Sequence, residues 1–231
     1  MPSPRDVGVV IVAAGRGVRL GGSRPKQYLP IAGIPMLLRA IRPFSCHPEV
    51  RQVIVALPAD DAAAPPDWLA PHLGNGLRVV AGGAERSDSV SRGLGALDAT
   101  CSIVLVHDAA RPFVTRDVLD AVIAAARAGE GAVPAVPVAD TLKQSDDGGH
   151  VARTVPRDGL WRAQTPQGFP RALLAQAHAQ AKADGVSGTD DAFLVERLGG
   201  RVRLVAGDPR NLKITTADDL VLAEVLAGQF L

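Results

Sequence analysis

The chain has 231 residues, of which 25 are Lys or Arg and 24 are Asp or Glu, so its net charge is +1. This balance argues against bulk nucleic-acid binding, which needs many uncompensated cations, and two Trp, one Tyr and five Phe are too few for a base-stacking platform. The longest apolar run, residues 7–15, is too short to span a membrane.

Five continuous apolar runs predict strands that are buried on both faces, as parallel strands usually are. In chain order they are residues 7–13, 52–57, 77–81, 103–107 and 132–138. Amphipathic stretches between them predict helices: Pro35 opens the first, Val90 lies on the apolar stripe of the second, and Thr115 caps the third, which Gly129 ends. This alternation predicts an α/β fold, a Rossmann-like, doubly wound and mostly parallel sheet with helices on both faces.

The pattern changes after Val138. Residues 140–165 are polar and contain the turn signal DDGG at 146–149, between two short segments that predict a β-hairpin, 141–143 and 151–154. Such a hairpin has little apolar surface and is only marginally stable in water by itself. It therefore needs a surface to pack on, either on its own domain or on a second subunit.

After this segment, the alternation of predicted helices and strands resumes. The remaining predicted elements are helices at 170–183, 190–198 (behind the cap Thr189) and 216–226, and a strand at 201–205. We predict a single domain over residues 1–231, with an inserted, protruding hairpin arm at about 138–160 that serves dimerisation. Cys46 and Cys101 form no C-x-x-C motif and are expected to be reduced, buried thiols of a cytoplasmic protein.

The first loop, residues 13–33, follows the first predicted strand and is rich in glycine and cations. Gly15 and Gly17 fit a dinucleotide fingerprint, but Leu20 stands where the third glycine is required, and the Gly-Lys pair of a P-loop is absent. Glycines still let backbone N–H groups approach an anion. Four cations lie in this loop: Arg16, Arg19, Arg24 and Lys26. We predict that the loop holds a triphosphate; a solvated basic loop is the alternative.

Two further loops follow predicted strands. In GGAERSDSV, residues 82–90, the glycines permit close backbone contact with a flat ligand, and Ser89 lies in the first turn of the next helix. In VHDAARPFV, residues 106–114, Asp108 is placed to hold a ribose hydroxyl or Mg²⁺, and Arg111 to bind a phosphate with two N–H groups. A surface ion pair between Asp108 and Arg111 is the alternative there.

Later residues are interpreted mostly as structural. His107 is expected to be hydrogen-bonded in the core, Thr189 to cap a helix, and Trp161 and Phe169 to anchor the core. Lys213, one of only four lysines, lies on a strand-like stretch. Polar segments occur where packing would not require them, at 157–169, 188–192 and 210–216.

Together these segments resemble the 2-C-methyl-D-erythritol 4-phosphate cytidylyltransferases of the non-mevalonate isoprenoid pathway. The resemblance covers nearly the whole chain, and the ordered set of motifs is more specific than any one of them. The motifs are AAGRGVRL, PKQYL, GGAERSDSV, HDAARP, DT at 140–141, LWRAQTPQGF, TDDA and NLKIT. The resemblance implies transfer of CMP from CTP to a phosphorylated polyol, with Mg²⁺ or another divalent cation as cofactor, and no nucleic-acid or membrane partner.

The resemblance also implies a role for each matching residue. The CTP phosphates would be held by Gly15, Gly17, Arg19 and Lys26, the cytosine by Ala14, Gly83 and Ser89, and the ribose by Asp108 and Ala109, with Asp108 also near the metal. The acceptor would face Arg111, Thr189 and Lys213. Thr141 and Arg157 of the arm would reach the site of the neighbouring subunit, which predicts a homodimer. Catalysis would rest on Arg19, Lys26 and Lys213, which stabilise negative charge on the reacting phosphates.

Two alternatives stay open. A cytidylyltransferase that acts on ribitol 5-phosphate would share the first loop and the dimeric arm; Thr141, Arg157 and Thr189 favour methylerythritol phosphate without separating the two sharply. A non-catalytic nucleotide-binding protein on the same fold is the second alternative. The joint presence of Lys26, Asp108 and Lys213 argues against it, because binding alone would not need the full set.

Overall fold

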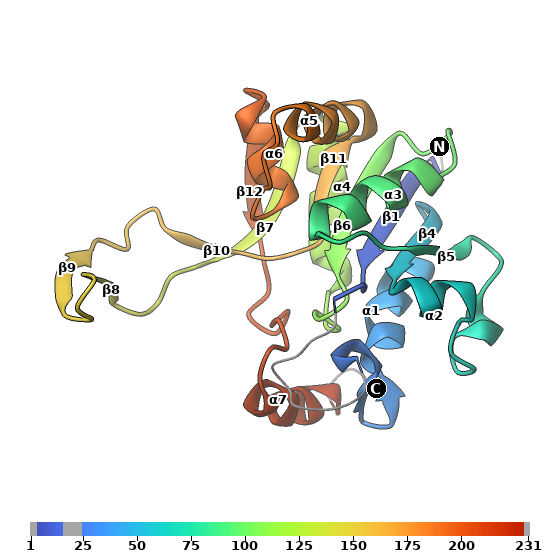
Figure 1. Cartoon of the computed structure of the whole chain (residues 1–231), viewed down its shortest axis with the longest axis horizontal. Coiled ribbons are helices and arrows are strands. Elements are labelled where there is room, and N and C mark those ends of the chain that lie inside the picture. The colour runs from blue at the N-terminus through green and yellow to red at the C-terminus, as the bar shows by residue number, and fades with distance from the viewer. Residues whose placement is uncertain (1–3, 16–24, 229–231) are drawn as a thin grey trace.

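Five strands form at the predicted apolar runs in a computed structural model, which describes residues 4–15 and 25–228 (Figure 1). They are β1 (Val7–Val12), β4 (Val50–Leu57), β5 (Leu77–Ala81), β6 (Ile103–Asp108) and β7 (Gly131–Pro137). Val9, Ile54 and Val106 of these strands are fully buried. Burial on both faces explains why the runs are continuous rather than alternating.

The sheet is mixed but mostly parallel, which confirms the predicted fold class. Its eight strands lie in the order β10–β7–β11–β6–β1–β4–β5, and β12 (Val202–Ala206) pairs with β7. The strands β1, β4, β5 and β6 pair in parallel, as do β7 and β12. Two strands run antiparallel: β11 (Gln167–Pro170), between β6 and β7, and β10 (Trp161–Ala163), beside β7.

Both antiparallel strands overlap residues 157–169, where the sequence pattern indicates only a polar segment, so neither strand is predicted. β11 consists of Gln, Gly, Phe and Pro, so no apolar run marks it, and only its pairing between two buried strands makes it a strand. Phe169 is fully buried, as expected. The expectation for Trp161 is wrong: this side chain lies on the end strand β10 and is 46% exposed.

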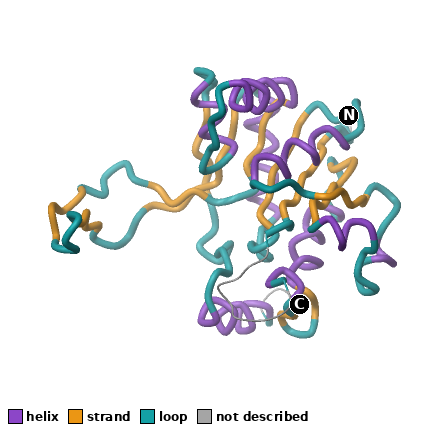
Figure 2. Tube along the Cα trace, viewed as in Figure 1, coloured by secondary structure: helices purple, strands orange, loops and turns teal. Residues whose placement is uncertain are grey.

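Helices cover both faces of the sheet (Figure 2). On one face lie α1 (Met36–Ser45) and α4 (Arg116–Arg127); on the other lie α3 (Arg86–Ala96), α5 (Arg171–Ala183) and α6 (Asp191–Arg197). Leu119 of α4 joins the same core cluster as Leu105, whereas Leu94 of α3 joins the opposite cluster with Val104. Adjacent residues of β6 thus face opposite layers of helices.

A third, smaller cluster lies under the last helix, α7 (Ala217–Ala227). Ala223 and Ala227 of α7 join Met36, Phe113 and the fully buried Ile214 in this cluster. The cluster holds the segment that precedes α7 beside the loop that follows β6. The remaining short elements are η2 (Lys26–Tyr28), β2 (Pro30–Ile31), β3 (Ile34–Pro35), α2 (Ala59–Ala63) and η3 (Ala70–His72).

Of two predicted helix caps, the structure has one at the expected residue. Thr115 is the N-cap residue of α4, but its side chain makes no capping hydrogen bond. The cap of α6 is Asp190, whose carboxylate accepts a hydrogen bond from the Phe193 N–H at 2.9 Å, so the expectation that Thr189 caps this helix is wrong by one residue. An ionised carboxylate is the stronger acceptor for an N–H at a helix start.

The predicted hairpin is confirmed as β8 (Leu142–Ser145) paired with β9 (Val151–Val155). Figure 1 shows this hairpin extending from the body of the molecule, beyond β10. Its residues are almost all exposed, and Val151 is 63% exposed. In the structure the hairpin therefore does not pack on its own domain, and its contact with a second subunit remains a prediction.

Two further expectations concern the cysteines and membranes. Both cysteines are free, and Cys101 is buried as expected, but the expectation for Cys46 is wrong because this residue is exposed at the end of α1. Within residues 4–15 and 25–228, no helix is long and apolar enough to cross a membrane.

Candidate active site at the carboxyl ends of the strands

The loops after β1 and β5 meet at the carboxyl edge of the sheet. A Cβ atom at Gly82 would lie 2.4 Å from the Cβ of Ala14 and 2.9 Å from the Oγ of Ser89. At Gly83 it would lie 2.1 Å from the Cβ of Asp88. Both glycines are therefore required by contacts within the chain itself, whereas the sequence suggested ligand contact alone as the reason for them.

Ser89 holds the shape of the second loop. Its side chain is nearly buried, and its Oγ accepts a hydrogen bond from the Gly83 N–H at 3.1 Å and lies 3.2 Å from the Glu85 carbonyl, to which it donates. The role of Gly83 and Ser89 in reading the base remains a prediction.

Asp108 is the last residue of β6, and cations surround it. Its Oδ2 lies 2.7 Å from Lys213 Nζ, and its Oδ1 accepts from Arg86 Nε at 3.4 Å. Burial acts to raise the pKa of Asp108, but the charges of Arg86 and Lys213 outweigh it and lower the pKa to about 2. The alternative, a surface ion pair between Asp108 and Arg111, is wrong: Asp108 pairs with Arg86 and Lys213 instead.

Arg86 joins Asp108 to a buried ion pair. Its Nη1 lies 2.7 Å from Oδ2 of Asp191, whose other oxygen lies 2.9 Å from His178 Nε2. Burial acts to raise the pKa of Asp191, but its hydrogen bond to His178 and the charge of Arg86 lower it. Arg86 is absent from the predicted site residues, although it is the only cation in GGAERSDSV, which is the signal that could have identified it.

His107 lies in the core behind Asp108, as expected. Its Nε2 lies 2.9 Å from the Arg111 carbonyl oxygen, and its Nδ1 lies 3.0 Å from Thr165 Oγ1, which accepts from the Asp108 N–H at 3.0 Å. A carbonyl oxygen can only accept, so Nε2 carries the proton and the neutral ring accepts at Nδ1 from the Thr165 hydroxyl. Burial lowers the pKa of His107 to about 4.

This pKa predicts how stability depends on pH. Unfolded His107 binds a proton near pH 6.5, whereas folded His107 stays neutral down to about 4, so the unfolded state binds more protons in between. As pH falls from 7 to about 4, the His107 contribution lowers the free energy of unfolding by about 3 kcal/mol. Urea unfolding of the wild type and of His107→Gln measures it: the variant should lose less stability over this range, and an equal loss in both would contradict the assignment. His72→Gln, on the surface, is the control.

Lys26 opens the short helix η2 and reaches the segment that carries Lys213. Its Nζ donates to the Ile214 carbonyl at 2.8 Å. The buried neighbour Gln27 donates from Nε2 to the Ala13 carbonyl at 2.7 Å, which ties η2 to the end of β1. The structure thus brings Lys26, Asp108 and Lys213 together from three separate segments. Lys213 itself lies in an irregular segment, so the expectation of a strand there is wrong.

Arg111 lies beside the same group. Its Nη1 donates to the Asn211 carbonyl at 2.8 Å and its Nη2 to the Ala163 carbonyl at 3.3 Å. Burial lowers the pKa of Arg111. Ala109 follows Asp108 and donates its N–H to the Val12 carbonyl, at the end of β1, at 3.2 Å.

The other predicted site residues that the structure describes lie outside the group around Asp108. Thr189 is exposed and precedes the cap Asp190, which accepts from Gln167 Nε2 at 2.7 Å. Thr141 and Arg157 are exposed at the two ends of the hairpin, and Arg157 donates to the Ala139 carbonyl. They are not part of the site in their own chain. Gly15 is exposed at the end of a described segment, whereas Gly17 and Arg19 lie outside the described residues.

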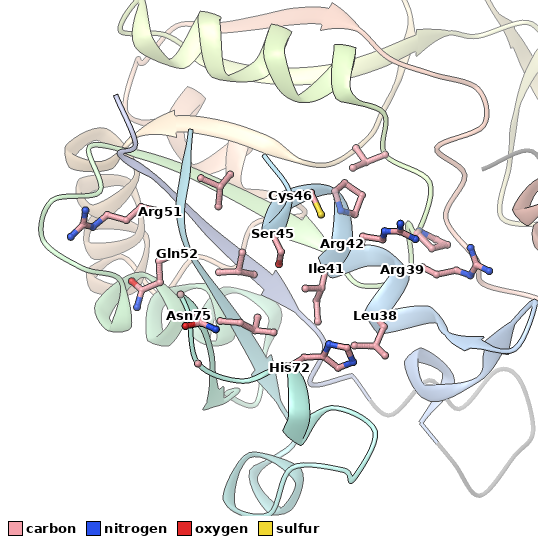
Figure 3. A pocket seen from close by; sticks show the side chains of 18 of the residues that line it. Leu38, Arg39, Ile41, Arg42, Ser45, Cys46, Arg51, Gln52, His72 and Asn75 are labelled. Atoms are coloured by element: carbon pink, nitrogen blue, oxygen red, sulfur yellow. The ribbon is translucent and has the colours of Figure 1, made fainter. Parts of the chain in front are cut away.

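A cavity of about 870 Å³ lies elsewhere (Figure 3). It is lined by residues of α1, such as Leu38 and Ile41, and by Gln52 and Leu77 at the amino ends of β4 and β5. The site around Asp108 lies at the carboxyl ends of the strands, so this cavity belongs to the opposite edge of the sheet. In open α/β sheets ligands bind at the carboxyl ends, and the cavity is not part of the candidate site.

A mostly parallel α/β sheet with glycine loops and clustered cations at its carboxyl edge is the arrangement of an enzyme that binds nucleotides and transfers phosphoryl-type groups. Comparisons with known proteins agree. The family model for 2-C-methyl-D-erythritol 4-phosphate cytidylyltransferase matches residues 7–229. The chain therefore belongs to this family of nucleotidyltransferases, as the motifs had suggested.

Individual relatives support this assignment over nearly the full chain. The 2-C-methyl-D-erythritol 4-phosphate cytidylyltransferase of Symbiobacterium thermophilum is 49% identical, with 95% of this chain and 92% of the relative covered. That of Geobacter metallireducens is 46% identical, with 93% and 94% covered. The crystal structure of the enzyme from Thermus thermophilus has a TM-score of 0.80 at 41% identity, and the match covers 95% of this chain and 98% of that one.

Proposed function

We propose that the protein transfers the cytidylyl group of CTP to 2-C-methyl-D-erythritol 4-phosphate, giving 4-diphosphocytidyl-2-C-methyl-D-erythritol and pyrophosphate. The observation that carries this proposal is the arrangement of two lysines at the carboxyl edge of the sheet. Lys213 lies 2.7 Å from Asp108, and Lys26 donates to the carbonyl of Ile214, the residue after Lys213. Membership of the family supplies the two substrates.

In the reaction, a phosphate oxygen of the acceptor attacks the α-phosphorus of CTP. A new P–O bond forms, the bond from the α-phosphorus to the bridging oxygen breaks, and that oxygen leaves with the pyrophosphate. A phosphate monoester is already anionic at neutral pH, so no strong general base is required. The barrier comes from bringing two polyanions together and from charge that develops on the phosphates, so positioning and electrostatic stabilisation carry the catalysis.

Different residues of this chain position the reactants and stabilise the negative charge. Lys26 and Arg19 neutralise the leaving pyrophosphate, and Lys213 stabilises the α-phosphate. Lys213 is held by Asp108 at 2.7 Å, yet its side chain is 46% exposed, so it can turn from the carboxylate toward a phosphate. Gly15 and Gly17 help to hold the CTP phosphates. Ala14, Gly83 and Ser89 contact the cytosine, and Asp108 and Ala109 hold the ribose. Arg111 and Thr189 face the acceptor.

Asp108 also fits the role of a magnesium ligand. Mg²⁺ in phosphoryl-transfer sites is commonly held by one or two carboxylates together with substrate phosphates. Within the described part of the chain, no group of three or more His, Cys, Asp or Glu could hold a metal by itself, which suits an ion that arrives with the nucleotide. When bound, Mg²⁺ would neutralise charge on the triphosphate oxygens.

The arm supports a homodimer with shared sites. An isolated two-stranded hairpin is marginal in water, and β8 and β9 form a separate sheet with no other strand beside it among the described residues. Leu160 and Trp161 at its base are large apolar side chains that are also exposed. A second subunit would cover these surfaces and would place Thr141 and Arg157 at the partner's site.

The proposal is tested by measuring pyrophosphate release from CTP and Mg²⁺ with the purified protein and added 2-C-methyl-D-erythritol 4-phosphate. Release that depends on this acceptor is expected. CTP binding without release would instead favour a nucleotide-binding protein. We also propose a cytoplasmic location, on the ground that both cysteines are free thiols.

A further inference from the structure

Lys213 lies in a segment, residues 208–214, that is neither helix nor strand, so its position depends on individual hydrogen bonds. Gln164 holds the start of the segment: its Nε2 donates to the Asp208 carbonyl at 2.8 Å, and its Oε1 accepts from the Asp208 N–H at 3.2 Å. At the other end, the Ile214 N–H donates to the Ala110 carbonyl at 2.8 Å. Lys213 is therefore held close to the loop after β6 on one side.

Asn211 holds the middle of the segment and is completely buried. Its Nδ2 donates to the Thr165 carbonyl at 2.9 Å and lies 3.4 Å from Gln164 Oε1. Both neighbours are acceptors, which determines which end of the Asn211 amide faces them. The backbone carbonyl of Asn211 accepts from Arg111 Nη1 at 2.8 Å.

These bonds form a closed ring beside the site, and the Asp108 N–H donates to its member Thr165. Thr165 lies beside His107, His107 Nε2 donates to the Arg111 carbonyl, and Arg111 donates to Asn211, which returns to Thr165. The ring joins three segments: the end of β6, the residues just before β11, and the segment that carries Lys213. The members of the ring are largely buried, so water cannot replace a partner that is lost. Breaking one hydrogen bond therefore leaves a buried polar group unsatisfied.

We propose that Asn211 is a positioning residue, which sets the separation of Lys213 and Arg111 and thereby aligns the acceptor phosphate with the α-phosphorus of CTP. The inference rests on the proposed cytidylyl transfer, in which Lys213 stabilises the α-phosphate and Arg111 faces the acceptor. Asn211 touches neither reactant and acts through its bonds to the two loops. A displacement of about 1 Å between reacting groups can lower a rate about 100-fold.

Asn211→Ala tests this inference through a split between rate and nucleotide binding. We expect kcat to fall about 100-fold, whereas the Kd of CTP changes less than about threefold, because the hydrogen bonds of the Asn211 side chain lead to residues 164 and 165 and not to the cytosine loops at Ala14 and Gly83. Ile123→Val, which removes one methylene group from a buried side chain of α4, is the matched control for lost stability and should retain kcat. A wild-type kcat in Asn211→Ala would overturn the proposal.

A double-mutant cycle separates positioning from a merely structural role. If Asn211 acts through Lys213, Asn211→Ala should lower kcat less than about threefold once Lys213→Ala is present. A further 100-fold loss in that background would show independent effects and would overturn the proposal.

Hydrogen exchange supplies a readout that does not depend on turnover. Because the Ile214 N–H bonds the Ala110 carbonyl, its exchange should be at least about tenfold faster in Asn211→Ala than in Ile123→Val. Unchanged exchange at Ile214 would overturn the positioning role even if the wild type is inactive. Failure of the wild type to release pyrophosphate would count against the proposed function and not against the positioning role of Asn211.

Discussion

Lys213→Ala is expected to lower kcat about 1,000-fold while CTP still binds. The loss of one preorganised charge at a developing oxyanion commonly costs between about 100-fold and 1,000-fold in kcat, and Lys213 is placed at the upper end because it acts at the α-phosphorus itself. Its Nζ lies 2.7 Å from Asp108 Oδ2, and Arg86 binds the other oxygen of the same carboxylate, so the Lys213 charge lies within the candidate site. Steady-state kinetics with both substrates, together with calorimetry for CTP, measures the two parts of this prediction.

Lys182→Ala is the matched control, because Lys182 is an exposed lysine in the last turn of α5 and is not one of the site residues. It should leave kcat unchanged. An effect of Lys213→Ala confined to KM, with kcat preserved, would remove Lys213 from the transition state and limit it to binding.

If the arm completes the partner's site, a mixed dimer of Arg157→Ala and Lys213→Ala should be active, although each variant alone has little activity. Arg157→Ala is expected to lower kcat/KM for the acceptor about 100-fold, since removing one partner of a charge pair commonly costs about 2–5 kcal/mol. Lys213→Ala is inactive for the separate reason given above. In a mixed dimer, one site combines Arg157 from one subunit with Lys213 from the other and is intact.

Coexpression of the two variants with different tags tests this expectation. Random pairing in a symmetric dimer makes half of the dimers mixed, each with one intact site of two, so about one quarter of the wild-type activity should return. Dimers of each variant alone serve as controls. No recovery in purified mixed dimers would mean that Arg157 serves its own chain or has no role in the site.

The main strands could be predicted from the sequence because parallel strands covered on both faces must be apolar at nearly every position. Residues 103–107 illustrate this, since Leu105 and Val104 pack against opposite helix layers and both are buried. β11 could not be found in this way. Gln167 and Gly168 have no strand signal of their own and are ordered by pairing with β6, about 60 residues earlier in the chain.

The residues of the candidate site also fall into two groups, those that the sequence marks and those that it does not. Residues with strong chemistry of their own, such as Lys26, Asp108 and Lys213, could be singled out because a motif or a rare residue type marks them. Asn211 has no such mark, and Arg86 is marked only as the single cation of GGAERSDSV. The role of each comes from contacts with residues that are distant in the chain. Arg86 meets Asp191 across a separation of 105 residues, and Asn211 meets Thr165 across 46.

The cap of α6 shows how local patterns also mislead by one position. Thr189, Asp190 and Asp191 all have side chains that can cap a helix, and the structure gives each a different environment. Asp190 caps the helix, Asp191 is buried against Arg86 and His178, and Thr189 remains exposed. Only the packing of α6 on α5 and the sheet decides among them.

The central claim is best tested by pyrophosphate release from CTP and Mg²⁺ in parallel reactions with 2-C-methyl-D-erythritol 4-phosphate, with ribitol 5-phosphate, and with no acceptor. Rapid release with the methylerythritol phosphate alone, with the CDP-alcohol formed in equal amount, is the result that this account predicts. Release with ribitol 5-phosphate alone, or CTP binding with no release in any of the three reactions, would contradict it.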